Sequence, residues 1–188
     1  MHATLGGDVN AFHGLVEAHQ GQVYGLAARM LGNPGDAEDA AQDAFTQAYT
    51  RLASYNQEWR FKTWLMAITT HLCIDRLRRR KHEPLVFADY VYSASPGQSD
   101  DADPVEASFV SPEPQPDAVT MRRQQDAAIQ AMLAELAPED RAMLVMFYWN
   151  DMPYDEIAIV TGASVSAVKS RLFRARQKLA GSALAQRL

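Results

Sequence analysis

The chain has 188 residues and a net charge of −5, from 23 acidic and 18 basic side chains, with a hydrophobic share of 47%. This length suits one large domain or two small ones. A single cysteine, Cys73, excludes an intramolecular disulfide, and no apolar run is long enough to span a membrane. Residues 1–7 lack the basic flank and apolar stretch of a signal peptide, so we expect a cytoplasmic protein.

Charge is segregated along the chain. Residues 1–83 carry nine acids and nine bases, residues 84–120 seven acids and no base, and residues 121–188 seven acids and nine bases. Six of the nine prolines also fall within 84–120. Such a composition cannot bury enough apolar surface to fold alone, so we predict an acidic, proline-rich, disordered linker over 84–120. Basic patches can still form on the two flanks, despite the negative total.

The segment before the linker has helical periodicity. Apolar residues at spacings of three and four predict a first helix from about residue 12 to 30, which 32–35 (Gly-Asn-Pro-Gly) must end. Asp36 suits the N-cap of a second helix. A polar loop near 54–58 then leads to a third helix with a basic end. We expect the second helix to face inward with Ala41, Ala44, Phe45, Ala48 and Leu52, and outward with Glu38, Asp39, Gln42, Asp43 and Gln47.

The pattern after the linker is also helical. A helix is predicted around 129–136, and Pro138 suits the first turn of the next, whose residues 139–149 are apolar nearly all round and should be buried. Two short helices follow, over 153–160 and 165–179. No strand pattern competes anywhere. We therefore predict an all-α protein in which two small helical bundles are joined by the linker.

The last two predicted helices form a helix-turn-helix. Gly162 can adopt a positive φ at the end of the first, and Ser164 can cap the second. In the second helix Val168 and Leu172 belong to an apolar stripe, while the other faces carry five basic residues and no acid. This combination indicates a DNA-reading helix. The alternative is a basic, solvated helix that closes a bundle.

Aromatic and basic side chains alternate near the start of the third helix. Aromatic rings can stack on unpaired bases while cations hold the backbone. We expect Phe61 and Trp64 to belong to the core, and Tyr55 and Trp59 to be the better candidates for base contact. The basic cluster at the end of this helix could bind nucleic acid, or instead a membrane surface or phosphate groups.

Four motifs in order resemble the RNA polymerase sigma factors of the extracytoplasmic-function (ECF) type in the sigma-70 family. Residues 36–45 are similar to that family's polymerase-binding helix, and residues 61–65 with 75–78 to its minus-ten element. The Leu133, Leu136, Pro138 and Arg141 pattern and residues 168–176 are similar to its minus-thirty-five domain.

The resemblance implies three segments. Residues 8–83 would bind core RNA polymerase and melt the minus-ten element, 84–120 would be the linker that enters the polymerase, and 121–184 would read the minus-thirty-five element as duplex DNA. An anti-sigma factor is an expected partner. The implied polymerase-binding residues are Asp39, Gln42, Asp43 and Gln47. The implied minus-ten residues are Tyr55, Asn56, Trp59, Arg60, Lys62, His71, Arg76, Arg79 and Arg80. The implied minus-thirty-five residues are Ser166, Lys169, Ser170, Arg171, Phe173, Arg174 and Arg176, with Lys169, Ser170 and Phe173 on base edges and the arginines on phosphates or in helix packing.

Other functions fit less well. His71 stands where the family usually has Asn, which bears on minus-ten recognition. The five histidines and Cys73 have no metal-ligand spacing, and we expect no enzyme activity, metal or cofactor. Asp75, beside an apolar helix face, is expected to pair with Arg78 or Arg79. A dimeric repressor would explain only the helix-turn-helix. A sigma-like mimic that sequesters an anti-sigma factor without reading DNA is the main alternative.

Overall fold

The computed structural model describes residues 9–82 and 116–185, with side chains over 12–80 and 124–181. Every regular element in these ranges is a helix, which confirms the all-α prediction. The predicted linker lies largely outside the described residues. Helix α5 begins at Pro116, inside the range assigned to the linker. None of the described helices is long and apolar enough to cross a membrane.

The first bundle consists of α2 (Val9–Leu31), α3 (Pro34–Thr50), a short 3-10 turn η1 (Leu52–Ser54) and α4 (Phe61–His82). Helix α2 ends at Leu31 and is followed by Gly32, whose φ of 73° is the left-handed conformation that glycine adopts most readily. The predicted N-cap of α3 was wrong, because the cap is Asn33, whose Oδ1 accepts the Asp36 amide at 3.1 Å. Pro34 explains the earlier start, since it suits the first position of a helix.

Helix α3 packs on its neighbours through small side chains. Its fully buried residues are Ala37, Ala40, Ala44 and Ala48, so the inward face is rotated from the one we predicted. Phe45 is only partly buried, at the rim of the core. Alanines permit a close approach of two helices, and the bulkier Phe45 is left at the edge of that contact.

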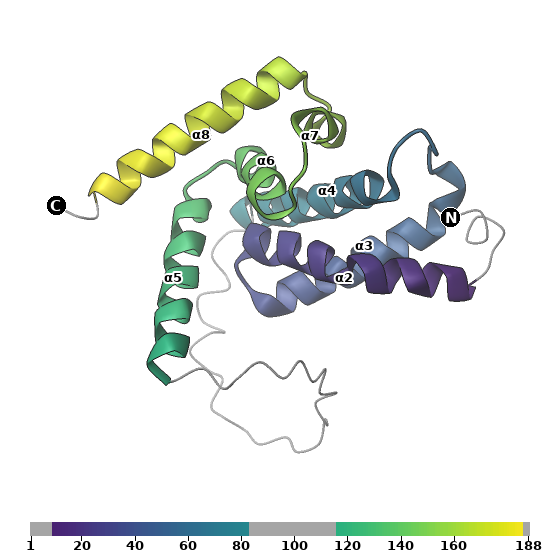
Figure 1. Ribbon diagram of the computed structural model, residues 1–188, viewed down its shortest axis with the longest axis horizontal. Helices are drawn as coiled ribbons and strands as arrows, with labels where there is room; N and C mark the ends of the chain where they lie inside the picture. Colours follow the sequence, from purple (N-terminus) through teal and green to yellow (C-terminus); the bar gives the residue numbers. More distant parts are fainter. Residues whose placement is uncertain (1–8, 83–115, 186–188) are drawn as a thin grey trace.

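The second bundle consists of α5 (Pro116–Ala134), α6 (Pro138–Trp149), α7 (Tyr154–Thr161) and α8 (Val165–Ala185). Helix α6 is buried over residues 141–146, as predicted, but the prediction was wrong at its end, where Tyr148 and Trp149 are exposed. Figure 1 shows α6 at the centre of the molecule, between α8 and the helices of the first bundle.

The two bundles are packed against each other. Helix α6 contacts α2 and α4, and α7 contacts α4, so the buried residues of both bundles form one continuous core. Cys73 on α4 belongs to this core, and burial raises the pKa of its thiol to about 12. The sequence predicted both bundles, but it did not predict that they share a core.

Candidate nucleic-acid interface

The turn between α7 and α8 has the predicted chemistry. Gly162 adopts a φ of 63°, and the Ala163 amide donates to the Ala158 carbonyl at 3.1 Å, which closes the end of α7. Ser164 Oγ accepts the Ala167 amide at 3.2 Å and so caps α8. These contacts fix the angle between the two helices of a helix-turn-helix.

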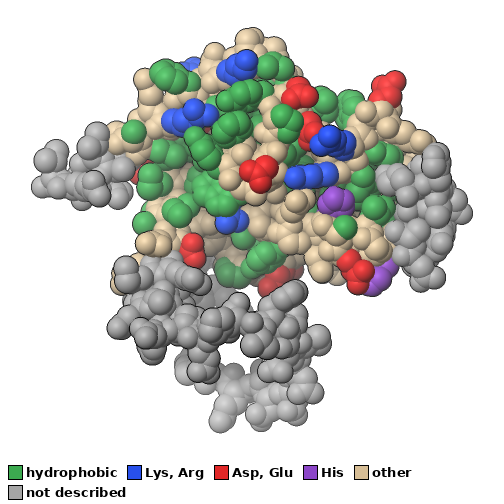
Figure 2. All heavy atoms as spheres, in the orientation of Figure 1, with side chains coloured by type: hydrophobic (Ala, Val, Ile, Leu, Met, Phe, Trp, Pro, Cys, Tyr) green, Lys and Arg blue, Asp and Glu red, His purple; other side chains and the backbone are tan. Residues whose placement is uncertain are grey.

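Helix α8 buries one face and presents the other. Val168, Leu172 and Ala175 are buried against the second bundle, while the Phe173 ring is 58% exposed. Figure 2 shows basic side chains over α8, interspersed with apolar ones. The exposed predicted readers on this face are Ser166, Lys169, Ser170, Phe173, Arg174 and Arg176.

Several cations of α8 have partners within the bundle. Arg171 donates to Asp140 Oδ1 of α6 at 2.6 Å, so it connects these two helices. The Lys169 ammonium lies 5.4 Å from the centre of the Tyr154 ring. The Arg176 guanidinium lies 5.5 Å from the ring centres of both Phe147 and Tyr148. Aromatic faces attract cations at these distances and hold the side chains in place on the exposed surface.

The loop before α4 contains an aromatic cluster that corrects the prediction for Tyr55. This residue is buried, and its ring centre lies 5.1 Å from that of Trp64 and 5.9 Å from that of Phe61. Its hydroxyl donates to the Trp59 carbonyl. Tyr55 therefore belongs to the core in this conformation and cannot stack on a base. Phe61 is buried too, as predicted.

The predicted minus-ten residues that are exposed in this loop are Asn56, Trp59 and Arg60. The amide of Asn56 donates to Glu58 at 3.2 Å, and its Oδ1 accepts the Glu58 amide at 3.0 Å, which stabilises the loop. The Trp59 ring is 39% exposed and remains available for stacking on a base. Among the predicted minus-ten aromatics, Trp59 thus keeps its candidate role.

The basic residues along α4 lie in different environments. Arg76 donates to Asp43 Oδ2 of α3 at 2.6 Å and to the Asp36 carbonyl at 3.0 Å. Arg80 forms an ion pair with the Asp36 carboxylate. These arginines connect α4 to α3, whereas Arg79 is exposed.

His71 and Asp75 line a cavity of about 290 Å³ between α4 and the second bundle. Within the described residues Asp75 forms no ion pair with Arg78 or Arg79, so that prediction was wrong. Arg78 instead donates to Glu139 of α6 at 2.7 Å. Burial alone would raise the pKa of Glu139, but the bonds to its own backbone and to Arg78 hold it below the usual value.

The outer face of α3 is exposed at Asp39 and Gln42, as predicted. Beside it runs a groove of about 540 Å³, lined by apolar residues of α2 and α3 that include Tyr24 and Phe45. Gln47 is half-buried, and the Asp43 carboxylate forms an ion pair with Arg76. An acidic rim next to an apolar groove is a suitable binding surface for a basic protein partner.

Four residues at the contact between the bundles were missed by the sequence analysis as site residues: Thr63, Arg141, Asn150 and Glu156. Thr63 and Asn150 are buried polar residues, and Arg141 is a buried cation whose Nη1 donates to the Met30 carbonyl at 2.7 Å. Desolvation lowers the pKa of Arg141. Their partners lie far away along the chain, so no local pattern could have identified the contacts.

Comparison with known families gives two matches. The model for Sigma-70 region 2 matches residues 15–83, and the model for Sigma-70, region 4, matches residues 126–179. Together they cover more than half of the chain, in the order that the sequence motifs suggested.

Individual proteins are similar over nearly the whole chain. The ECF RNA polymerase sigma factor SigW of Bacillus subtilis is 31% identical over 92% of this chain and 89% of its own length. SigE of Mycolicibacterium smegmatis is 35% identical over 88% of this chain but 58% of its own length. Among solved structures, CnrH in complex with the cytosolic domain of CnrY aligns with a TM-score of 0.69 and 25% identity, over 98% of this chain and 94% of that chain. The chain therefore belongs to the sigma-70 family, among the ECF sigma factors.

Proposed function

We propose that this chain directs core RNA polymerase to promoters through two DNA-reading surfaces. Residues 8–83 would bind the polymerase and the melted minus-ten strand, 84–120 would connect the domains within the polymerase, and 121–184 would read the minus-thirty-five duplex. The chain would act in the cytoplasm, as a transcription initiation factor without catalysis of its own.

The observation that carries this proposal is the exposed face of α8. Lys169, Ser170 and Phe173 project from the second helix of a helix-turn-helix, on the side opposite its buried stripe. A helix of this kind fits the major groove, where a lysine can reach guanine and an aromatic ring can touch a thymine methyl. Arg174 and Arg176 are placed farther along the axis and suit phosphates.

The polymerase would bind the outer face of α3. Asp39 and Gln42 are exposed there beside the apolar groove, so charged and apolar contacts could form together. Minus-ten contacts would come from Trp59, Arg60 and Lys62 at the start of α4, with Arg79 farther along it. We also propose that an anti-sigma factor binds this chain, by analogy with the solved complex of CnrH with the cytosolic domain of CnrY.

Transcription in a purified system tests the function. Core polymerase with and without the chain would transcribe fragmented genomic DNA, and the RNA 5′ ends would be sequenced. We expect the chain to add start sites that share two sequence elements upstream. If the chain adds no start site but still captures an anti-sigma factor, the sigma-mimic function replaces this proposal.

A further inference from the structure

Three consecutive aromatic residues end α6: Phe147, Tyr148 and Trp149. Because successive residues of a helix point about 100° apart, the three rings cannot share one face. The ring centres of Phe147 and Tyr148 are 5.1 Å apart, and those of Tyr148 and Trp149 are 6.2 Å apart, each pair in an edge-on arrangement. The rings therefore spread around the end of α6 and reach different neighbours.

The first of these rings stacks on α7. Phe147 lies nearly parallel to Tyr154, with an angle of 9° between the ring planes and 5.1 Å between their centres. Tyr154 is the first residue of α7, and both side chains are half-buried against the core. Parallel rings at this distance attract each other, and burial on one side limits their movement. These two rings, the ring stack, form a rigid platform beside α8.

Two cations of α8 lie against the ring stack. The Lys169 ammonium lies 5.4 Å from the centre of the Tyr154 ring. The Arg176 guanidinium lies 5.5 Å from the centre of the Phe147 ring. The two cationic residues are seven positions apart, which is about two helical turns, so they lie on one side of α8. Each cation thus has its own ring, and the two rings are in contact.

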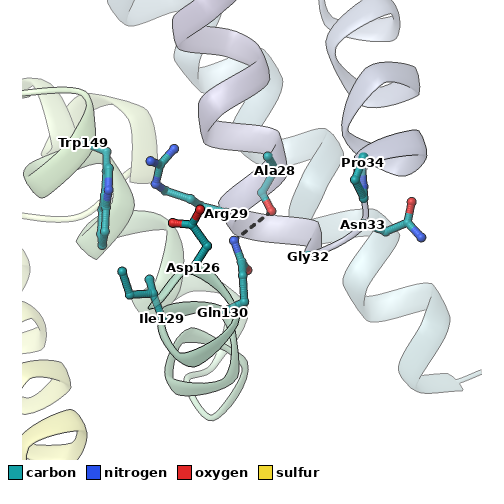
Figure 3. Close-up of a pocket in the computed structure, with 9 residues that line it drawn as sticks. All are labelled: Ala28, Arg29, Gly32, Asn33, Pro34, Asp126, Ile129, Gln130 and Trp149. Carbon is teal, nitrogen blue, oxygen red and sulfur yellow. Dashed lines mark hydrogen bonds between the residues drawn. The ribbon is translucent and has the colours of Figure 1, made fainter. Parts of the chain in front are cut away.

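The last ring of α6 holds a cation in a different environment. Figure 3 shows Arg29 of α2 extending toward Trp149, with Asp126 of α5 beside it. The guanidinium lies 5.0 Å from the ring centre. Burial lowers the pKa of Arg29, and the Asp126 carboxylate opposes this effect. Among residues 12–80 and 124–181, by contrast, neither Lys169 nor Arg176 forms an ion pair, so their charges remain available to DNA.

Lysine alone is an imprecise reader of DNA. Its ammonium is a compact charge on a flexible four-carbon stem, without the planar fork through which arginine fixes the angle of its hydrogen bonds. A free lysine on a recognition helix therefore reaches phosphates and several base edges alike. A ring beside the ammonium restricts these choices and reduces the conformational entropy that the side chain loses on binding. The ring stack thus gives Lys169 the direction that its own chemistry lacks.

We propose that Tyr154, held by Phe147, determines sequence preference at the minus-thirty-five element, because its ring positions the Lys169 ammonium at one base edge. Tyr154 belongs to the first helix of the helix-turn-helix and acts through Lys169, so it is a positioning residue. This inference rests on the proposed function and adds to it the origin of the sequence preference. Phe173 is 58% exposed and pairs with no other ring in the part of the chain that the structure describes, so it reads DNA independently of the ring stack.

The test is a selection of promoter DNA by holoenzyme. Core polymerase is reconstituted with the wild type or a variant, and it selects from a mapped promoter whose minus-ten element is fixed and whose minus-thirty-five element is randomised. Tyr154→Leu keeps an apolar side chain against Phe147 but removes the ring, whereas Tyr154→Phe keeps the ring and removes the hydroxyl. The readout is the enrichment of each base at each position, which a uniform loss of binding or of folded protein does not change.

The positions read by Lys169 are those at which Lys169→Ala relaxes the preference, and the inference fails if there are none. At these positions Tyr154→Leu should lower the enrichment about two- to five-fold, the contribution of an exposed contact between a cation and a ring, and Tyr154→Phe should retain it. The positions read by Phe173 should keep their enrichment. Wild-type enrichment in Tyr154→Leu would overturn the inference. An equal loss in Tyr154→Phe would also overturn it, because the hydroxyl would then contact DNA itself.

A double-mutant cycle separates positioning of Lys169 from distortion of α8. In the Lys169→Ala background, Tyr154→Leu should cause no further loss of preference, because no ammonium is left to position. A further loss would mean that Tyr154 acts by another route, and the inference would fail. If Tyr154→Leu does not fold, Tyr154→Met, which has a flexible apolar side chain, replaces it with the same expectations.

The matched control removes a ring from the other cation. Tyr148→Leu removes a ring centred 5.5 Å from the Arg176 guanidinium, so it should weaken binding to all sequences alike. If it relaxes the same positions as Tyr154→Leu, the loss of any ring has this effect and the inference is wrong. A wild-type holoenzyme that enriches no minus-thirty-five sequence would reject the proposed function, whereas enrichment that survives the loss of the Tyr154 ring rejects this inference alone.

Discussion

The two proposed DNA-reading surfaces, the exposed face of α8 and the start of α4, differ in their contacts with the rest of the chain. On α8 the candidate base readers are exposed, and two cations there, Lys169 and Arg176, are positioned by aromatic rings of the same bundle. At the start of α4, Lys62 and Arg60 face acceptors from the other bundle. The α8 surface is therefore exposed, whereas at the start of α4 Lys62 is partly buried against the other bundle while Trp59 and Arg60 stay exposed.

The largest expected effect is on the free energy of unfolding, and it compares a buried with an exposed residue of α8. Leu172 is 1% exposed and its neighbour Phe173 is 58% exposed. Leu172→Ala should lower the free energy of unfolding by about 2–5 kcal/mol, because it leaves a cavity in the core. Phe173→Ala should change it by less than about 0.5 kcal/mol. Urea denaturation measures both, and similar losses would mean that α8 does not present its face as described.

The next effect concerns DNA binding by the exposed face of α8. Lys169→Ala should cost about 1–3 kcal/mol of binding to the preferred minus-thirty-five sequence and relax the preference at one or two positions. Arg176→Ala should weaken binding to all sequences alike and reduce its salt dependence. Selection of minus-thirty-five variants by holoenzyme measures both. A uniform loss without altered preference in Lys169→Ala would make Lys169 a phosphate contact.

The contact between α4 and α7 can be weakened at Thr63. Thr63→Val removes the hydroxyl that bonds Glu156 and leaves the half-buried carboxylate short of a donor, so it should destabilise the chain by about 1–3 kcal/mol. Thr69→Val is the matched control, since its hydroxyl bonds only the Leu65 carbonyl of its own helix. Equal changes in the free energy of unfolding would show that the α4–α7 bond contributes nothing to the packing of the bundles.

The smallest effect concerns binding of core polymerase to the outer face of α3, which is exposed while the two bundles are packed together. Asp39→Arg should weaken binding to core polymerase by about 1 kcal/mol, mostly through slower association. Asp155→Arg makes the same charge change on α7 and should have little effect. Asp43 is less suitable, because its reversal would also break the contact with Arg76. Equal affinity of the two variants in pull-downs at moderate salt would place the polymerase surface elsewhere.

The sequence predicted contacts between neighbouring residues, but it did not predict contacts between residues far apart in the chain. The turn at Gly162 and Ser164 and the buried stripe of α8 are set by residues a few positions apart, so their chemistry was visible in the sequence. The bond between Thr63 and Glu156 joins residues 93 positions apart, and no local pattern predicts that the two side chains meet.

Two errors have the same physical origin. Tyr55 looked like a base-stacking residue because the loop around it is polar, but Phe61 and Trp64 of the next helix enclose its ring. Phe45 was predicted to face inward because it lies at helical spacing from Ala41 and Ala48, but α3 packs through alanines. In both cases the tertiary packing, rather than the local sequence, determined which face is buried.

The most direct test of the account compares the two surfaces in one assay. After promoters are mapped, the free chain and the holoenzyme are each titrated with a minus-thirty-five duplex and a single-stranded minus-ten probe, alongside scrambled versions of both. The account predicts that the free chain prefers the correct duplex by about ten-fold or more but does not discriminate between minus-ten strands, whereas the holoenzyme discriminates both. A free chain that selects the minus-ten strand as well as the holoenzyme does would contradict the account.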